Sequence, residues 1–525
     1  MTADVSAERP PRLTLRPAVV LASVHIGLRA ILIATGARFQ GQSLEYSWQL
    51  LDLKLLRHDP ISSIWRLHTQ PPLFNSIVAL LVRSPLRRDL TFEIVGHALA
   101  VVLVVGVWRM VAAWTRSRVA ATVAAIVVSI MPSVVVSEFQ PTYEIWVMVG
   151  LVWLVVFADT RRLVAAGVLA GAVALTRAMF HPVWLIVVVG LLAAAMSARR
   201  RSPSSSPAPS TSTSTSTRNV VLAWLRRAAL IGAVPFLATG FFLVKNAVLF
   251  DQTGLSSWLG MNLQRVAINP LTPAQHVAMT STGRLSGYSG VREFGRLDMY
   301  ERVAPCAPHS GHPALTEPEK DVDLSVVIPN FNDECYLPIY AAVGRDARRA
   351  IVEHPDAYAR GVWASARLFV KATETDALLH SDLASAYDAA WAVVLIAPPV
   401  TIDETSWVFP IAGIKTFSVH VSLVALAALV TTFAVGAVAA LRRRAVAGIP
   451  AGTAVLIAWT SLWCTASGIL LESGENERFR AMIDPLLVAV AVSVAVSVIG
   501  RRRARGRTVA ALPTPQGSAS SYKSW

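Results

Sequence analysis

The chain has 525 residues, of which 54% are apolar and only 15% are charged, and its mean hydropathy is +0.50. This balance excludes an ordinary soluble protein and indicates a chain surrounded mostly by lipid. The formal net charge is +15, but the arginines form short clusters beside apolar runs and no basic domain, which argues against nucleic-acid binding. The sequence therefore predicts an all-α polytopic membrane protein whose spanning elements are helices.

About ten apolar runs approach the length of about 20 residues that a helix needs to cross a bilayer. They are Ala18 to Gly36, Ile94 to Trp114, Val119 to Val136, Trp146 to Ala158, Val164 to Leu175, Pro182 to Met196, Ala228 to Phe250, Phe417 to Leu441, Ala451 to Leu471 and Pro485 to Ile499. The first run follows a polar tail and lacks a small-residue cleavage site, so we expect a retained anchor.

Arginine-rich loops alternate with these runs and set the predicted topology. If every run crosses, the clusters at 114–118, 160–163, 198–202, 442–445 and 501–507 all fall on one side. By the positive-inside rule this side is the cytoplasm, and both termini lie there. An arginine-, alanine- and valine-rich composition is typical of high-GC bacteria, so we expect a multi-pass protein of the bacterial inner (plasma) membrane.

The topology divides the chain into successive parts. They are an N-terminal transmembrane module at 1–250, an exoplasmic insert at 251–406, C-terminal transmembrane helices at 407–500, and a disordered cytoplasmic tail at 501–525. The N-terminal module contains a first exoplasmic loop at 37–91 and a disordered cytoplasmic Ser/Thr/Pro linker at 199–218. Within the first loop, "QPPLFNSIVALLV" at 70–82 is short, and counting it as a span would put the later arginine clusters outside, so we expect interfacial helices there.

The insert is predicted to be small and α-rich, with a helical pattern interrupted at Pro355. Its stretch "DLSVVIPNFNDE" at 323–334 looks like the opening of a nucleotide-sugar glycosyltransferase of the GT-A type. No further strands and no D-x-D motif follow, and nucleotide sugars are cytoplasmic, so we reject that interpretation. Cys306 and Cys335 share the insert, where they form either a disulfide or two unpaired thiols, and Cys464 lies within a span.

Four motifs fall on the predicted exoplasmic side. They are "SLEYSWQLLDLKLLRHDPISSIWRLHTQPPLFN" in the first loop, "MPSVVVSEFQPTYEIW", "GVLAGAVALTRAMF" and "ENERFRAMIDPLL". Their order and sidedness resemble the GT-C superfamily of polyprenyl-phosphate-sugar-dependent glycosyltransferases, such as the protein O-mannosyltransferases and the aminoarabinose transferases of lipid A. That family usually has an aspartate about four residues before the tyrosine, where this chain has Gln42 and Ser43, and the nearest acid is Glu45, beside Tyr46.

The resemblance implies transfer of a sugar from a polyprenyl-phosphate donor to an exoplasmic acceptor, which is a cell-envelope glycan, lipid or protein. Such a reaction needs a carboxylate to take the acceptor proton and cations to stabilise the departing phosphate. Glu45 is the expected base, and Glu144 is the second expected catalytic acid. The expected substrate-binding residues are Tyr46, His68, Arg177, Lys245, Glu477, Arg478 and Arg480.

No cofactor and no metal is expected, because His/Cys spacings typical of metal sites are absent from the sequence. The expected partners are the lipid-linked donor, the acceptor and the bilayer, with no nucleic acid.

Other interpretations remain open. Glu477, Arg478 and Arg480 would also fit an ion-pair network at helix ends, and Glu144 would fit an ordinary helix-start acid. His68 would fit a turn or interface residue, and Glu45 the solvated face of an interfacial helix. At the level of the whole chain, a lipid or solute transporter would need ionisable groups near mid-span and paired broken helices. A non-catalytic assembly protein would keep the GT-C-like fold without the usual aspartate.

Overall fold

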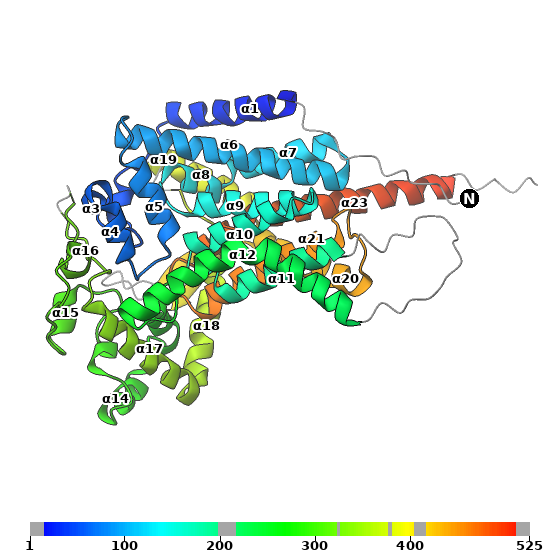
Figure 1. The fold of residues 1–525 in the computed structure, drawn as a ribbon. Helices are drawn as coiled ribbons and strands as arrows, with labels where there is room; N and C mark the ends of the chain where they lie inside the picture. The colour runs from blue at the N-terminus through cyan, green and yellow to red at the C-terminus, as the bar shows by residue number, and fades with distance from the viewer. Residues whose placement is uncertain (1–14, 198–216, 323–325, 376–380, 404–415, 511–525) are drawn as a thin grey trace, which may run out of the picture.

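The computed structural model describes residues 15–197, 217–322, 326–375, 381–403 and 416–510. In these residues the chain is almost entirely helical, with a single two-stranded antiparallel sheet. The long helices run side by side as a bundle, and shorter helices gather at one end of it (Figure 1). Most of the predicted linker at 199–218 lies outside the described residues, and residues 217–218 begin a helix.

The apolar runs form the helices of the bundle. These are α1 (Leu15–Ala34), α6 (Arg88–Thr115), α7 (Arg118–Ile130), α8 (Pro132–Phe139), α9 (Glu144–Asp159), α10 (Leu163–Thr176), α11 (Pro182–Ser197), α12 (Thr217–Phe250), α20 (Leu423–Arg442), α21 (Ala451–Leu470) and α23 (Asp484–Ala510). Each predicted run coincides with one of these helices or, at 119–136, with the pair α7 and α8. The prediction of an all-α, multi-pass membrane protein is confirmed.

The predicted count of about ten crossings is not confirmed. Among the described residues, six helices are long and apolar enough to cross alone, namely α1, α6, α12, α20, α21 and α23, and the pair α7–α8, bent by 53°, raises the number to seven. Helices α9, α10 and α11 have 16, 14 and 16 residues. They are shorter than the roughly 20 residues that a perpendicular crossing requires.

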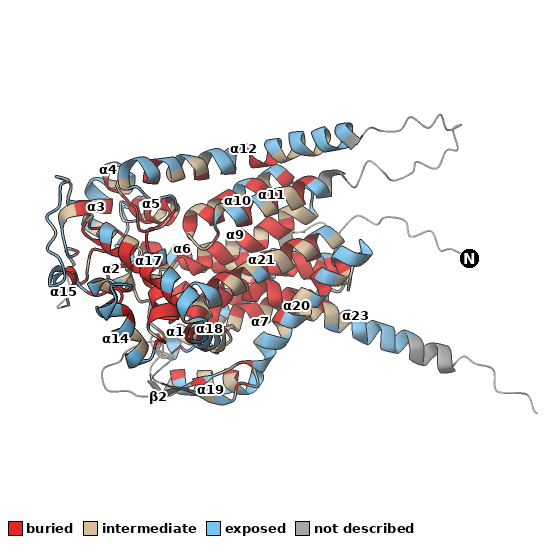
Figure 2. Cartoon of the chain, turned by 90° about the horizontal axis from the view of Figure 1, so that it is seen from below, coloured by how far each residue is buried: buried red, intermediate tan, exposed pale blue. Residues whose placement is uncertain are grey.

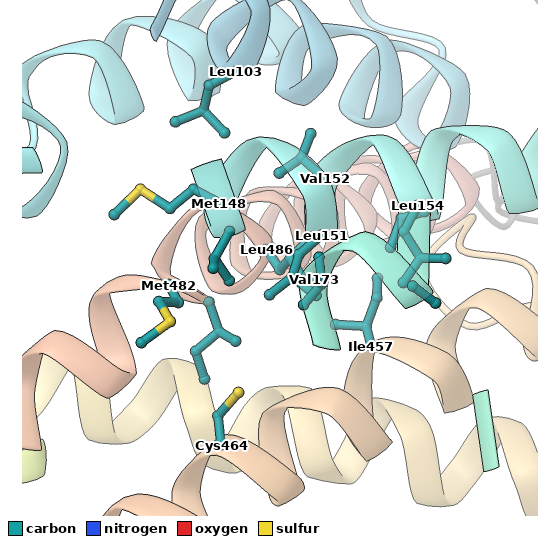
Figure 3. Packing of buried hydrophobic residues seen from close by; sticks show 14 of the residues in the cluster. Leu103, Met148, Leu151, Val152, Leu154, Val173, Ile457, Cys464, Met482 and Leu486 are labelled. Atoms are coloured by element: carbon teal, nitrogen blue, oxygen red, sulfur yellow. The ribbon is translucent and has the colours of Figure 1, made fainter. Parts of the chain in front are cut away.

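Helix α9 lies inside the bundle and packs against α6, α10, α21 and α23. In Figure 3 its side chains Met148 and Leu151 lie among Val173, Ile457 and Leu486, which come from α10, α21 and α23. Figure 2 shows α9 and α10 as mostly buried and α21 as mostly buried or intermediate, whereas much of α12 is exposed. Exposed apolar side chains on α1 and α12 suit contact with lipid, where no hydrophobic penalty applies.

Helix ends in the bundle follow from local sequence. Pro132 lacks a backbone N–H and begins α8, which breaks the helical run after Ile130. Ser422 caps α20 by accepting a hydrogen bond from the Ala425 amide at 3.0 Å. The predicted span at 417–441 therefore starts late, because residues up to His420 belong to strand β2 (Thr416–His420), which pairs with β1 (Pro399–Asp403).

Short helices fill the first loop and the insert. They are α2 (Ser43–Tyr46), α3 (Leu53–His58), α4 (Pro60–Trp65) and α5 (Pro72–Leu81) in the first loop, and α13 (Leu259–Leu263), the π-helical turn η2 (Gln264–Ile268), α14 (Pro273–Ser281), the 3₁₀ turn η3 (Gly287–Gly290), α15 (Leu297–Glu301), α16 (Pro313–Thr316), α17 (Tyr336–Glu353), α18 (Pro355–Phe369) and α19 (Ser381–Val394) in the insert. The predicted break at Pro355 is confirmed, since α18 begins there.

The insert has its own aromatic core around Tyr300, Phe331 and Tyr336. A disulfide joins Cys306 to Cys335 and confirms the first of the two cysteine alternatives. The described part of 323–334 contributes only an isolated bridge, between Glu319 and Pro329, which agrees with rejecting the nucleotide-sugar fold.

The arginine-rich loops share the opposite end of the bundle. Trp114 donates a hydrogen bond to Asp159 at 2.7 Å, and Thr453 donates to the same carboxylate. Arg161 donates to the Ala195 carbonyl at 2.7 Å. The start of α1 and the end of α23 also lie at this end (Figure 1). Since α23 continues to Ala510, residues 501–510 of the predicted disordered tail are helical, and 511–525 lie outside the described residues.

A buried polar cluster holds the bent pair against α1 and α6. Glu138 of α8 accepts a hydrogen bond from Arg29 at 2.6 Å and lies 3.0 Å from His25 and 2.5 Å from His97. Arg29 also donates to the Ser129 carbonyl at 2.7 Å. Removing one partner from such a buried charge cluster leaves the others unsatisfied, so the cluster fixes how α8 sits in the bundle.

Candidate functional site

A cavity of about 1200 Å³ lies between the end of the bundle and the insert. It is lined by residues from α2 and the first loop, from α8 and the turn after it, from the α10–α11 turn, from the insert, and from α21 and α22 (Asn476–Ala481). These are the segments that the arginine pattern predicts to emerge together. The cavity therefore collects polar residues from five parts of the chain that are far apart in sequence.

Arg478 and Glu144 form the central ion pair of this cavity. Nε of Arg478 donates to Oε1 of Glu144 at 2.8 Å, and a terminal guanidinium nitrogen lies 2.7 Å from the same oxygen. Glu144 is the first residue of α9, where the helix dipole favours a carboxylate. Its Oε2 is buried and accepts no hydrogen bond from the described residues. The pair thus places a guanidinium and a carboxylate in the cavity lining, and one oxygen of that carboxylate is buried without a donor.

Arg177 joins this pair through aromatic rings. Its guanidinium lies 4.4 Å from the ring centroid of Tyr143 and 5.1 Å from that of Phe479, and Arg478 lies 5.4 Å from the Tyr143 ring. Among the described residues, Arg177 forms no ion pair with a carboxylate, so its donors remain available to an anion. The two arginines come from the α10–α11 turn and from α22.

Three acids of the segment before and within α22 also line the cavity. Burial raises the pKa of Glu472, although Arg265, 3.2 Å away, works against this shift. Burial likewise raises the pKa of Glu477. Burial opposes ionisation of Glu475 too, but Arg478 and its neighbouring arginines outweigh it and lower the pKa. The acids therefore differ in their readiness to hold a proton although they are close in sequence.

Glu45 does not line this cavity, although its neighbour Tyr46 does. The Glu45 side chain is 7% exposed and forms an ion pair with Arg88 at 2.6 Å. It borders a separate space of about 50 Å³ beside Lys54 and Lys320. Glu45 and Tyr46 therefore border different spaces, although they are adjacent in the sequence.

His68 and Lys245 are also outside the cavity lining. The His68 ring lies 2.9 Å from the Ser257 hydroxyl and 3.0 Å from the Asn332 carbonyl, and burial lowers its pKa to about 3, so the ring is neutral. Lys245 donates to the Leu67 carbonyl. Both side chains fasten the first loop, His68 to the insert and Lys245 to α12.

Arg480 is buried behind the cavity wall. It donates to Asp484 at 3.1 Å and to the carbonyls of Phe369 and Lys371 at 3.0 and 2.5 Å. These contacts connect α22 to α23 and to the end of α18. The structure thus brings together Tyr46, Glu144, Arg177, Glu477 and Arg478 in one cavity, and it leaves Glu45, His68, Lys245 and Arg480 outside the lining.

We expect Arg480→Ala to destabilise the fold by about 3–5 kcal/mol, because it leaves buried Asp484 without its cation, with only the Ser133 hydroxyl still donating to it, and leaves two carbonyls without their donor. The measurement is the thermal unfolding of the purified variant. Arg480→Met combined with Asp484→Leu removes both charges and should recover most of the loss. An Arg480→Ala protein as stable as the wild type, but with weakened donor binding, would contradict this structural role.

Several cavity residues were not predicted. Arg265, Arg345, Arg348 and Lys371 line the cavity from the insert, which has no recognisable motif. The positive charge of these insert residues was the only feature of the sequence that could have indicated a role in an anion-binding cavity. Tyr143 is not part of the lining, but its ring lies against Arg177 and Arg478. Among the described residues, no group of three or more His, Cys, Asp or Glu side chains is arranged to hold a metal ion.

No protein-family model matches the chain, and no curated protein matches it. Among solved structures, the chain is similar to the crystal structure of ArnT from Cupriavidus metallidurans in the apo state, at 13% identity and a TM-score of 0.29. The similarity covers 95% of this chain and 80% of that one. A TM-score this low carries no conclusion about the function of the chain.

Proposed function

We propose that the protein is an integral-membrane glycosyltransferase of the GT-C type, which transfers a sugar from a polyprenyl-phosphate donor to an exoplasmic acceptor. The observation that carries the proposal is the cavity at the end of the bundle, where Arg177 and Arg478 stand beside Glu144. A lipid-linked phosphate would enter from the bilayer and meet guanidinium donors in a partly buried setting, where charge-assisted hydrogen bonds are strong.

In the proposed step the acceptor hydroxyl attacks the anomeric carbon of the donor sugar. The bond between that carbon and the phosphate oxygen breaks, and the electron pair leaves with the polyprenyl phosphate. Arg478 and Arg177 stabilise the charge that builds on this leaving group. The hydroxyl proton passes to Glu144, whose Oε2 has no hydrogen-bond donor among the described residues.

Glu144 takes the role of base in this proposal because of its position. Its Oε1 is held by Arg478, so the carboxylate and the phosphate-binding guanidinium share one wall of the cavity. Glu45, the base expected from the sequence, is paired with Arg88 and borders a different space. Deprotonation of the acceptor hydroxyl by Glu45 is the competing assignment, and it would leave the overall function the same.

A radiolabel-transfer assay tests the function. Membranes that contain the protein would be given polyprenyl-phosphate mannose, arabinose or glucose, and label would be followed into envelope glycans, lipids and proteins. The proposal predicts transfer from one donor that depends on Glu144. A transporter would instead move labelled lipid or solute across the membrane without forming a new glycosidic bond, and an assembly protein would do neither.

The proposed sidedness places the cavity outside the cytoplasm and the arginine-rich loops inside, in the plasma membrane of a bacterium. We expect a cysteine replacing exposed Ser281 to react with a membrane-impermeant maleimide in intact cells, and one replacing exposed Arg444 to react only after lysis. Native background should be low, because Cys306 and Cys335 are bonded and Cys464 is buried. The reverse labelling pattern would invert the topology.

A further inference from the structure

Helix α17 of the insert forms one wall of the cavity with a continuous face. The lining residues are Tyr340, Ala341, Gly344, Arg345 and Arg348, which follow the period of an α-helix. The helix is fixed in place from behind, because Asp346 accepts hydrogen bonds from Ser286 and Ser289 at 2.6 to 2.7 Å. The two arginines are therefore presented to the cavity by a rigid element.

Close packing of α13 also fixes this wall. A Cβ atom added to Gly260 of α13 would lie 2.2 Å from the Tyr340 carbonyl oxygen and 2.9 Å from the Gly344 nitrogen. Backbone-to-backbone contact of this kind leaves α17 no room to tilt toward its neighbour. The spacing between the α17 arginines and the rest of the insert is thus set by the fold.

Arg345 and Arg348 have no carboxylate partner in the described chain, unlike most other charges of the cavity. Glu144 and Glu475 pair with Arg478, Glu472 pairs with Arg265, and Glu374 pairs with Lys371. The remaining lining carboxylates, Asp251 and Glu477, form no ion pair with either arginine of α17. The wall thus offers two guanidinium groups, three residues apart, that no acid of the described chain neutralises.

We propose that Arg345 and Arg348 form a second anion-binding site, which holds a phosphate or carboxylate group of the acceptor while the donor phosphate occupies Arg177 and Arg478. This inference rests on the proposed function, because it assigns the acceptor side of the same cavity. Guanidinium groups bind such anions through paired hydrogen bonds, and neighbouring arginines favour an anionic acceptor over its neutral counterpart. The acceptor is therefore an anionic glycan or glycolipid.

The test uses the full chain in phosphatidylcholine nanodiscs, saturated with polyprenyl phosphate. Glucose 6-phosphate is titrated as the probe, with glucose as its neutral counterpart, and binding is measured by calorimetry. We expect Arg345→Gln combined with Arg348→Gln to weaken glucose 6-phosphate binding about tenfold or more. Arg349→Gln is the matched control, because Arg349 lies on the same helix but donates to the Arg284 carbonyl outside the cavity lining.

Unchanged affinity in the double variant would overturn the inference, as would an equal loss in Arg349→Gln, which would indicate a general effect of charge. Nanodiscs that contain phosphatidylglycerol form a second arm. If this lipid competes with the probe only when Arg345 and Arg348 are present, the pair binds a lipid head group and the acceptor assignment is wrong. Failure of polyprenyl phosphate to bind at all would count against the proposed function and not against the α17 site.

Discussion

Glu144→Gln should lower the transfer rate by about 100-fold or more, since a positioned general base contributes roughly 10²–10⁴ to a rate. Gln keeps the shape of the side chain and can still accept a hydrogen bond from Arg478, so the cavity should persist. Affinity for polyprenyl phosphate should change little, because Glu144 acts on the acceptor proton. The measurement is single-turnover transfer together with lipid-phosphate binding, on the same purified variant.

Glu45→Gln is the matched comparison. It makes the same chemical change at the carboxylate that the sequence favours, but in the separate space beside Arg88. We expect its turnover to stay within about threefold of the wild type, because Glu45 lies outside the cavity and glutamine can still accept the hydrogen bond from Arg88. An inactive Glu45→Gln beside an active Glu144→Gln would return the role of base to Glu45. Loss of activity in Glu477→Gln alone would move the role to the other cavity acid with a buried, unpaired oxygen.

Arg478→Met should reduce kcat/KM by about 10²–10³, the usual cost of removing a donor that stabilises developing negative charge. In contrast to Glu144→Gln, it should also weaken polyprenyl-phosphate binding, because the phosphate is charged before and during the reaction. The substitution leaves Glu144, 3% exposed, without its cation, so a loss of stability should accompany the kinetic effect.

Arg478→Lys separates the two effects of that change. Lysine keeps the positive charge, but it lacks the planar fork that lets Arg478 contact Glu144, Glu475 and Tyr143 at once. We expect intermediate donor affinity and nearly normal thermal stability. Arg478→Met with wild-type donor affinity would show that the ion pair is structural and that the lipid phosphate binds elsewhere.

Much of the fold was predictable because the bilayer restricts the structures that can span it to helices with long apolar runs and to closed barrels. A helix in a bilayer needs long apolar runs, and each predicted run became a helix or a bent pair. The arginine loops could be grouped because orientation signals repeat, and Trp114, Asp159 and Thr453 do meet at one end. The number of crossings was not predictable in this way, since α9, α10 and α11 are apolar but have only 14 to 16 residues.

Only those site residues that lie in recognisable motifs could be predicted from the sequence. Glu144 and Arg478 were named from the order of short motifs, and the structure joins them although 334 positions separate them. Glu45 was favoured because it is the acid nearest to Tyr46, although it departs from the family spacing, but a four-residue helix, α2, turns it toward Arg88 and leaves Tyr46 at the cavity. Side-chain direction in so short a helix depends on tertiary contacts that spacing does not encode.

The insert was the least predictable part. Its position against the bundle depends on contacts between distant segments, such as Asn332 with the backbone of His68 and Arg265 with Glu472. Arg265 and Glu472 belong to no motif, and the quoted stretches that contain His68 and Asn332 do not show that these two residues meet. The α17 arginines consequently appear in the sequence as ordinary charges on an amphipathic helix, and only the folded chain places them in the cavity.

The central claim is that this cavity holds the phosphate of a polyprenyl-phosphate sugar. Electron cryomicroscopy of the Glu144→Gln protein in nanodiscs with such a donor tests it most directly, because the variant should bind the donor and not consume it. We expect phosphate density between Arg177 and Arg478, with the sugar directed toward residue 144. Density for the phosphate beside Arg88 and Glu45, or an empty cavity at saturating donor, would contradict it.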